Sequence, residues 1–224
     1  FFTYRILDED LQARTNFPNQ ITWSLSKTAG ASVDAWMNIT LASVLDLDCT
    51  KGELTALKNF NNNIIAFQEK GLSHVMFNSR AQIATSEAVP IQIANTGKVD
   101  GQQYLTTNIG CQDKWNIVTT PNGLYFIDYF NKSIYRFNGQ LEDISTPNGF
   151  RSWCYENLNS TSNIIGYYDV KNKEVMYYIG DTRFTLDQQY KEIKTDGTIS
   201  LVNIKPTWLG FSELTGTFSS FYTY

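Results

Sequence analysis

The sequence predicts an all-β fold in which antiparallel strands form the blade-like sheets of a partial or interrupted β-propeller, with one short helix. Three observations lead to this prediction: an aromatic and weakly charged composition, a recurring hairpin pattern, and glycines at turn-like positions. Aromatic residues make up 14% of the 224 residues and charged residues 18%, whereas an average globular domain is about 25% charged. This composition is typical of short strands joined by polar turns.

One hairpin pattern recurs along the chain. Its two clear copies are residues 124–139 (LYFIDYFNKSIYRFNG) and residues 165–180 (IGYYDVKNKEVMYYIG), and both contain Asp-x-x-Asn-Lys between aromatic runs. A weaker copy, residues 57–67 (LKNFNNNIIAF), keeps the central Asn but has Lys58 in place of the aspartate. Asp and Asn bond their own backbone and tolerate turn geometry, whereas the flanking residues suit a half-buried strand. Each copy therefore predicts a β-hairpin.

The spacing of the copies predicts the size of the repeated unit. Asp169 follows Asp128 by 41 positions, which is about the length of one four-stranded propeller blade. Equivalent places in a repeat indicate a repeated structural role, so we expect both aspartates to fix turns. The expected structural turn positions are Asp128, Asn131, Asp169, Asn172 and Asn61.

The same pattern divides the chain. We expect a β-rich N-terminal segment over residues 1–50 and a propeller-like β domain over residues 51–224, with an insertion near residues 84–107. A complete propeller has about 4 to 8 blades, so three hairpins do not close a ring. The sequence is therefore expected to be a fragment of a longer chain.

One short helix is expected between the two clear copies. Thr146 is placed to cap it, and Pro147 suits its first position. The apolar residues that would share its buried face are Phe150, Trp153, Cys154 and Leu158.

Charge and motif content exclude several classes of protein. The net charge of -4 and the absence of a Lys/Arg cluster argue against a nucleic-acid-binding surface. The 3 cysteines are far apart and form neither a disulfide framework nor a CxxC motif. No phosphate-binding glycine loop, zinc-protease motif or serine-hydrolase motif occurs, and no stretch approaches the roughly 18 apolar residues of a membrane helix. We expect no cofactor, no metal site and no membrane-spanning segment.

A few residues of the sequence could in principle be catalytic. The single histidine, His74, lies among apolar residues, where a structural role is typical. A nucleophilic pair with Cys111 would require the two side chains to meet in the fold. Paired carboxylates for glycoside hydrolysis need only converge to about 5–10 Å, and Asp128 and Asp169 are the acids to consider. We expect no catalytic residue.

The alternative function is a carbohydrate-binding or glycoside-hydrolysing β-propeller, which requires exposed aromatic rings and two close carboxylates in one concave pocket.

The second half of the sequence resembles a family of phage proteins. Residues 110–118 (GCQDKWNIV), 123–128 (GLYFID), 135–139 (YRFNG) and 211–222 (FSELTGTFSSFY) are similar to segments of the large tail structural proteins of crAss-like bacteriophages. Those proteins form the muzzle or stabilisation part of a short tail. The likeness is good over about residues 105–224 and looser over the first hundred residues.

The resemblance implies a function and a location. It implies a non-enzymatic structural component of the virion tail, made in the cytoplasm of the bacterial host. Identical subunits would form a muzzle- or nozzle-type ring that lines or closes the channel for genome ejection. The implied partners are copies of itself, other tail proteins and, transiently, ejected DNA or proteins. An acidic surface suits such a conduit, because a basic lining would hold DNA through its phosphates.

Overall fold

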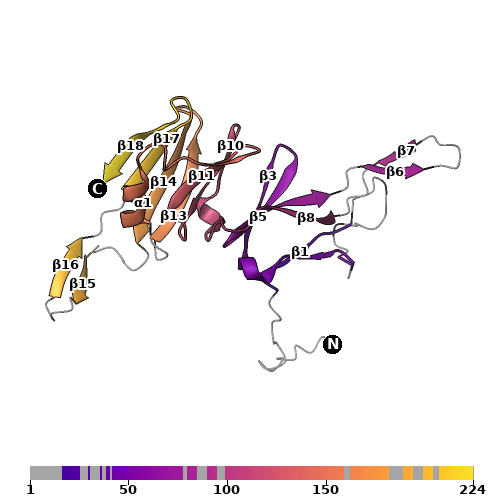
Figure 1. Ribbon diagram of the computed structural model, residues 1–224, viewed down its shortest axis with the longest axis horizontal. Helices are drawn as coiled ribbons and strands as arrows, with labels where there is room; N and C mark the ends of the chain where they lie inside the picture. Colours follow the sequence, from indigo (N-terminus) through magenta and orange to yellow (C-terminus); the bar gives the residue numbers. More distant parts are fainter. Residues whose placement is uncertain are drawn as a thin grey trace, which may run out of the picture.

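The structure is a computed structural model that describes residues 17–25, 30, 36, 39–40, 42–77, 80–84, 90–94, 99–158, 162–181, 189–193, 199–203 and 207–223. The regular elements of these residues are β-strands, two short 3-10 helices and a single α-helix, so the predicted all-β class is confirmed. Three four-stranded antiparallel sheets follow one another along the chain (Figure 1). In each sheet, the order of the strands in space is the same as their order in the sequence.

The three large sheets are named here in chain order. The first sheet consists of β3 (Leu54–Phe60), β4 (Asn63–Gln68), β5 (Gly71–Phe77) and β8 (Val99–Thr106). The second sheet consists of β9 (Val118–Thr120), β10 (Gly123–Asp128), β11 (Ser133–Phe137) and β12 (Leu141–Asp143). The third sheet consists of β13 (Ser162–Asp169), β14 (Glu174–Asp181), β17 (Thr207–Ser212) and β18 (Thr217–Thr223).

Three strand pairs lie outside these sheets. They are β1 (Gln20–Thr22) with β2 (Val44–Asp46), β6 (Arg80–Ala84) with β7 (Pro90–Ala94), and β15 (Gln189–Ile193) with β16 (Ile199–Asn203). The second pair interrupts the first sheet between β5 and β8, and the last pair interrupts the third sheet between β14 and β17. The chain thus leaves the first sheet after Phe77 and returns at Val99, so only part of the segment expected as an insertion, residues 84–107, lies outside the sheet.

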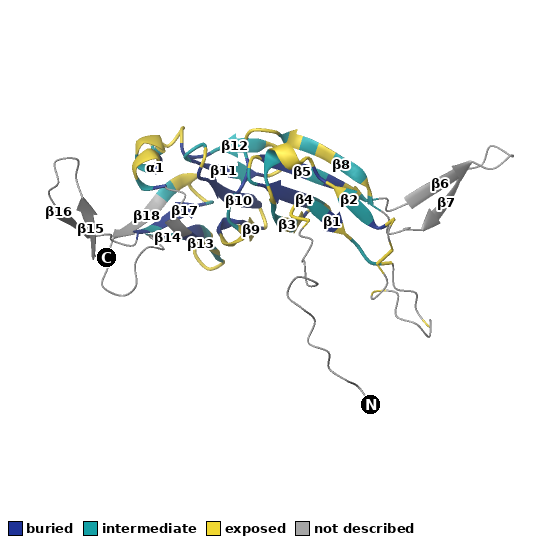
Figure 2. Cartoon of the chain, turned by 90° about the horizontal axis from the view of Figure 1, so that it is seen from below, coloured by how far each residue is buried: buried dark blue, intermediate teal, exposed yellow. Residues whose placement is uncertain are grey.

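The second sheet is covered on both faces. Along β10, Leu124 and Phe126 belong to the core shared with the first sheet, whereas Tyr125 and Ile127 belong to the core shared with the third sheet. All four side chains are 0% exposed, and Figure 2 shows β10 as a fully buried strand. Two-sided burial explains why this strand reads as a continuous apolar run instead of an alternation of apolar and polar residues.

Aromatic rings connect the sheets. Phe126 of β10 meets Phe67 of β4 edge to face, with ring centroids 5.2 Å apart, and stacks on Tyr135 of β11 at 5.7 Å. Toward the third sheet, Tyr125 lies 5.8 Å from the ring of Phe211. Aromatic pairs of this geometry stabilise a core beyond the area they bury, so each boundary between sheets has its own aromatic core.

The N-terminal strand pair adds a further layer. Ile21 of β1 and Leu47, which follows β2, pack with Ala66 and Val75 on the face of the first sheet that points away from the second. The order of layers is therefore β1–β2, first sheet, second sheet and third sheet.

The α-helix, α1 (Arg151–Asn157), starts later than predicted. The predicted cap, Thr146, instead donates its hydroxyl to Asp143, and Pro147 lies in a turn. Asp143 also accepts hydrogen bonds from the backbone amide and hydroxyl of Ser145. These bonds hold the chain in a turn that ends at Gly149, whose φ of +67° is not helical.

The predicted buried face of the helix is confirmed. Cys154 and Leu158 are 0% exposed within the core of the second and third sheets, and Phe150 and Trp153 pack against that core. The ring of Phe150 stacks on Phe218 of β18 at 4.4 Å. The helix therefore closes one end of this core.

We expect Phe126→Ala to lower the free energy of unfolding by about 3–5 kcal/mol, because it removes a fully buried ring between two sheets. Urea unfolding followed by near-ultraviolet circular dichroism measures the change. Phe130→Ala is the matched control, since Phe130 is 54% exposed. Equal effects of the two substitutions would contradict the two-sided core.

Candidate functional site

The carboxylate of Asp128 organises the turn between β10 and β11. Its Oδ1 accepts hydrogen bonds from the backbone amides of Phe130 (2.8 Å) and Asn131 (3.2 Å), and its Oδ2 accepts one from Asn131 Nδ2 (2.7 Å). Lys132, which follows, has a positive φ of 51°. The side chain thus satisfies amides that the strand ladder leaves free.

The turn between β13 and β14 has the same bonds. Asp169 Oδ1 accepts from the amides of Lys171 (2.9 Å) and Asn172 (3.3 Å), and its Oδ2 accepts from Asn172 Nδ2 (2.8 Å). Lys173 has a φ of 54°. The bond from the Asn172 amide contributes most to holding the pKa of Asp169 below its usual range. The two turns are therefore alike in hydrogen bonding and in backbone conformation.

The turn of the weaker copy is different. Asn61 and Asn62 have φ values of 50° and 61° and alone connect β3 to β4, which is typical of a two-residue type I′ turn. Lys58 lies within β3, paired with Ile65, and not in the turn. Asparagine tolerates this left-handed conformation better than most residues, so Asn61 contributes through its backbone conformation and not through a carboxylate-like side chain.

The two matching turns also occupy different places in their sheets. The turn at Asp128 joins the second and third strands of its sheet, whereas the turn at Asp169 joins the first and second strands. The spacing of 41 positions therefore relates two hairpins and not two equivalent positions of successive sheets.

Asp128 has a second set of partners that Asp169 lacks. It accepts hydrogen bonds from Gln112 Nε2 (3.0 Å) and from the backbone amide of Gly110 (3.2 Å), both in the segment that connects the first sheet to the second. The same Gln112 amide donates to the backbone carbonyl of Glu69, at the turn between β4 and β5. Asp128 is 1% exposed, and its two oxygens receive five hydrogen bonds in all. It is thus shielded from solvent and linked to the first sheet.

Gly110 marks the closest approach of this connecting segment to the first sheet. A Cβ atom at Gly110 would lie 2.3 Å from the backbone oxygen of Gln68, which cannot move without disturbing the strand. The neighbouring amide of Cys111 donates to the same oxygen at 3.0 Å. This position therefore requires glycine.

A corresponding link joins the second sheet to the third. Glu213, in the turn after β17, accepts hydrogen bonds from Thr120 Oγ1 (2.6 Å), Asn122 Nδ2 (3.0 Å) and the Tyr168 hydroxyl (2.9 Å). Thr120 and Glu213 are 93 positions apart in the sequence. Sequence reasoning missed Glu213, because a single acid in a polar turn carries no local pattern that indicates such a distant partner.

We expect Asp128→Ala to lower the free energy of unfolding by about 3 kcal/mol, because it leaves several buried donors without an acceptor. Asp169→Ala removes the same turn bonds at the surface and should have a smaller effect. Thermal unfolding of the two variants measures the difference. Equal losses would show that the turn, and not the link to the first sheet, accounts for the stabilisation by Asp128.

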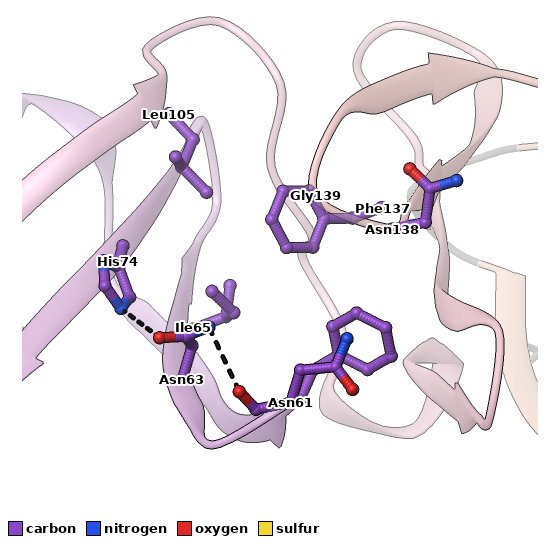
Figure 3. A pocket seen from close by; sticks show the side chains of 9 residues that line it. Asn61, Asn63, Ile65, His74, Leu105, Phe137, Asn138 and Gly139 are labelled. Carbon is purple, nitrogen blue, oxygen red and sulfur yellow. Dashed lines mark hydrogen bonds between the residues drawn. The ribbon is translucent and has the colours of Figure 1, made fainter.

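A hollow of about 210 Å³ opens between the first and second sheets at the end where the β3–β4 and β11–β12 turns lie (Figure 3). The polar residues that line it are Asn61, Asn63, Asn138 and His74. Its apolar lining includes Phe60, Ile65 and Phe137. His74 forms a 3.1 Å hydrogen bond with Asn63 Oδ1, and no carboxylate, Lys or Arg is among the lining residues. The hollow therefore lacks the paired acids of a glycosidase.

A second hollow contains acids without aromatic rings. Glu53, Glu69 and Asp113 contribute to its lining, together with Lys114 and Gln112. Asp113 caps a short 3-10 helix, η4 (Lys114–Asn116), by accepting from the Trp115 amide at 3.0 Å. In these two hollows the carboxylates and the aromatic residues are separate, whereas the glycosidase alternative requires both in one pocket.

Cys111 and His74 do not form the nucleophilic pair considered above. The single proton of the Cys111 thiol has two acceptors within reach, Asn116 Oδ1 (2.8 Å) and the carbonyl of Asp113 (3.1 Å), whereas His74 forms a hydrogen bond with Asn63. Cys111 and Cys154 are both 0% exposed. Burial raises the pKa of the Cys111 thiol, and it raises the pKa of the Cys154 thiol to about 12. Both thiols are therefore protonated at neutral pH and poor nucleophiles.

We expect a small aromatic disulfide reagent at pH 8 to label Cys49 rapidly and Cys111 and Cys154 only after unfolding, because Cys49 is exposed and the other two are buried. Peptide mass spectrometry before and after addition of urea identifies the labelled residues. Rapid labelling of Cys111 in the folded chain would restore it as a candidate nucleophile.

Within the described part of the chain, no three His, Cys, Asp or Glu side chains are grouped so that they could hold a metal ion. Among the same residues, no helix is long and apolar enough to cross a membrane. A further acidic cluster of the sequence, Asp8, Glu9 and Asp10, lies outside the described residues.

Comparison with known proteins places the chain among phage proteins. The sequence profile of the family described as Crassvirus muzzle protein matches residues 1–224, and the chain belongs to this family. The curated Muzzle protein of Bacteroides phage crAss001 is 39% identical over an alignment 224 positions long, which covers 95% of this chain and 16% of that relative. The resemblance seen in the sequence is thereby confirmed, and the chain spans 16% of the length of this relative.

Proposed function

We propose that this chain is a structural, non-enzymatic part of the tail muzzle of a crAss-like phage virion. The observation that carries the proposal is the match of the whole chain to the muzzle family, together with 39% identity to the Muzzle protein of phage crAss001. Because the chain corresponds to 16% of that relative, we further propose that it functions within a longer polypeptide.

The packing of the sheets supports a rigid structural role. Each boundary between layers has its own apolar core, and the two boundaries between the large sheets are also linked by hydrogen bonds at Asp128 and Glu213. Successive four-stranded antiparallel sheets that pack face to face are typical of propeller blades. We therefore keep the propeller-like arrangement as part of the proposal, with the sheets acting as blades and the turn residues Asp128, Asn131, Asp169, Asn172 and Asn61 fixing their hairpins.

The proposed assembly is a ring of identical subunits at the distal end of the tail, in contact with other tail proteins and lining or closing the channel for genome ejection. The net charge of -4 is compatible with the passage of DNA, because an acidic surface does not bind phosphates. The separate positions of acids and aromatic residues in the two hollows argue against the glycosidase alternative.

The proposal is tested on purified phage particles. We expect peptides of residues 99–158 in their tryptic digest and antibody label against this segment at the tail tip in electron micrographs. A non-structural phage protein made in the same infection serves as the control for contamination. Absence of the peptides from intact particles would overturn the proposed function, and label on the capsid would overturn the proposed location.

A further inference from the structure

Among the residues that the structure describes, other sheets cover the third sheet on one face only. Ile164, Val175, Tyr177 and Leu209 pack toward the second sheet. Side chains alternate between the faces of a strand, so the neighbouring residues point to the opposite side. On that side lie Ile165, Tyr167, Met176, Tyr178 and Trp208, named here the outer face.

The outer face is apolar and partly exposed. Ile165 is 44% exposed and Tyr167 is 47% exposed, Tyr178 and Trp208 are half-buried, and Met176 is buried. The ring of Trp208 lies 5.0 Å from that of Tyr178 and 6.1 Å from that of Tyr167, so the three rings form one cluster across three strands. A solvent-facing side of an antiparallel sheet normally carries polar residues, and a contiguous apolar patch indicates an interaction surface.

One end of this face is polar. Asp169 and Glu174 lie opposite each other in the strand register, at the hairpin end of β13 and β14 and on the same side as the aromatic cluster. An apolar centre with a polar rim is the usual anatomy of a protein interface. The five side chains of the outer face include no carboxylate and no amide, and such groups are what orients a bound saccharide in a pocket.

We propose that the outer face packs against a further antiparallel β-sheet supplied by the same muzzle polypeptide. This inference depends on the proposed function, because it takes the chain to be part of a longer muzzle protein. Two observations favour this occupant: each preceding sheet is covered by the next one in chain order, and the 39% identical relative is much longer than this chain, which spans 16% of it. A fourth large sheet that followed this chain in the polypeptide would cover the outer face in the same way.

The test is hydroxyl-radical footprinting of the full-length muzzle polypeptide, isolated as a monomer. Tyr155 is the internal control, because it is the same residue type, lies on α1 and is 56% exposed in this chain. We expect Tyr167 to be oxidised several-fold more slowly than Tyr155, although their exposed fractions are similar here. Oxidation of Tyr167 at the rate that its 47% exposure predicts would overturn the proposal. Protection only in oligomers or assembled particles would also overturn it, because a second copy or another protein would then cover the face.

A substitution gives an independent readout in the same monomer. Tyr167→Lys should lower its unfolding midpoint, because the sheet that covers position 167 would bury a charge, whereas Tyr155→Lys should leave it unchanged. An unchanged midpoint for Tyr167→Lys would contradict the proposal. Both measurements are made on the monomer, whereas the proposed function is tested on virions. A negative result for the covered face can therefore be distinguished from a negative result for the proposed function.

Discussion

The structure depends on the burial of both faces of the second sheet. A sheet with an apolar face must cover it, and a sheet with two apolar faces needs a neighbour on each side. In β10, successive side chains from Leu124 to Ile127 enter two different cores. The first and third sheets pack on the two faces of the second, and the sequence of this one strand accounts for the middle position of the second sheet.

Apolar contacts alone do not fix the position of one sheet against the next, because they have little directionality. Hydrogen bonds supply that direction at each boundary. The Gln112 side chain connects Asp128 of the second sheet with the Glu69 carbonyl of the first. Glu213 of the third sheet receives donors from both ends of the turn that joins β9 to β10. Each boundary thus combines a broad apolar contact with a few polar groups of defined geometry.

Local chemistry made much of the fold predictable from the sequence. The aromatic hairpins and the buried face of α1 depend on residues that are close together in the chain, and such patterns indicate periodicity and turns directly. The start of the helix was predicted wrongly, because Asp143 competes for the hydroxyl of Thr146 and holds the preceding residues in a turn. The link at Glu213 joins residues far apart in sequence, and no local pattern predicts such a contact. The double role of Asp128 also depends on a distant partner, Gln112, which lies 16 positions away.

The two inserted hairpins have a consequence for how members of this family can differ in length. The β6–β7 and β15–β16 hairpins leave the first and third sheets between neighbouring strands and pair only with themselves among the described strands. Closing a longer loop costs little extra free energy, so residues can be gained or lost there while both sheets keep their pairing. The second sheet has short turns and two covered faces, and a change of length within it would disturb two cores at once. Insertions and deletions should therefore occur mainly in the first and third sheets, whereas the length of the second sheet should stay constant.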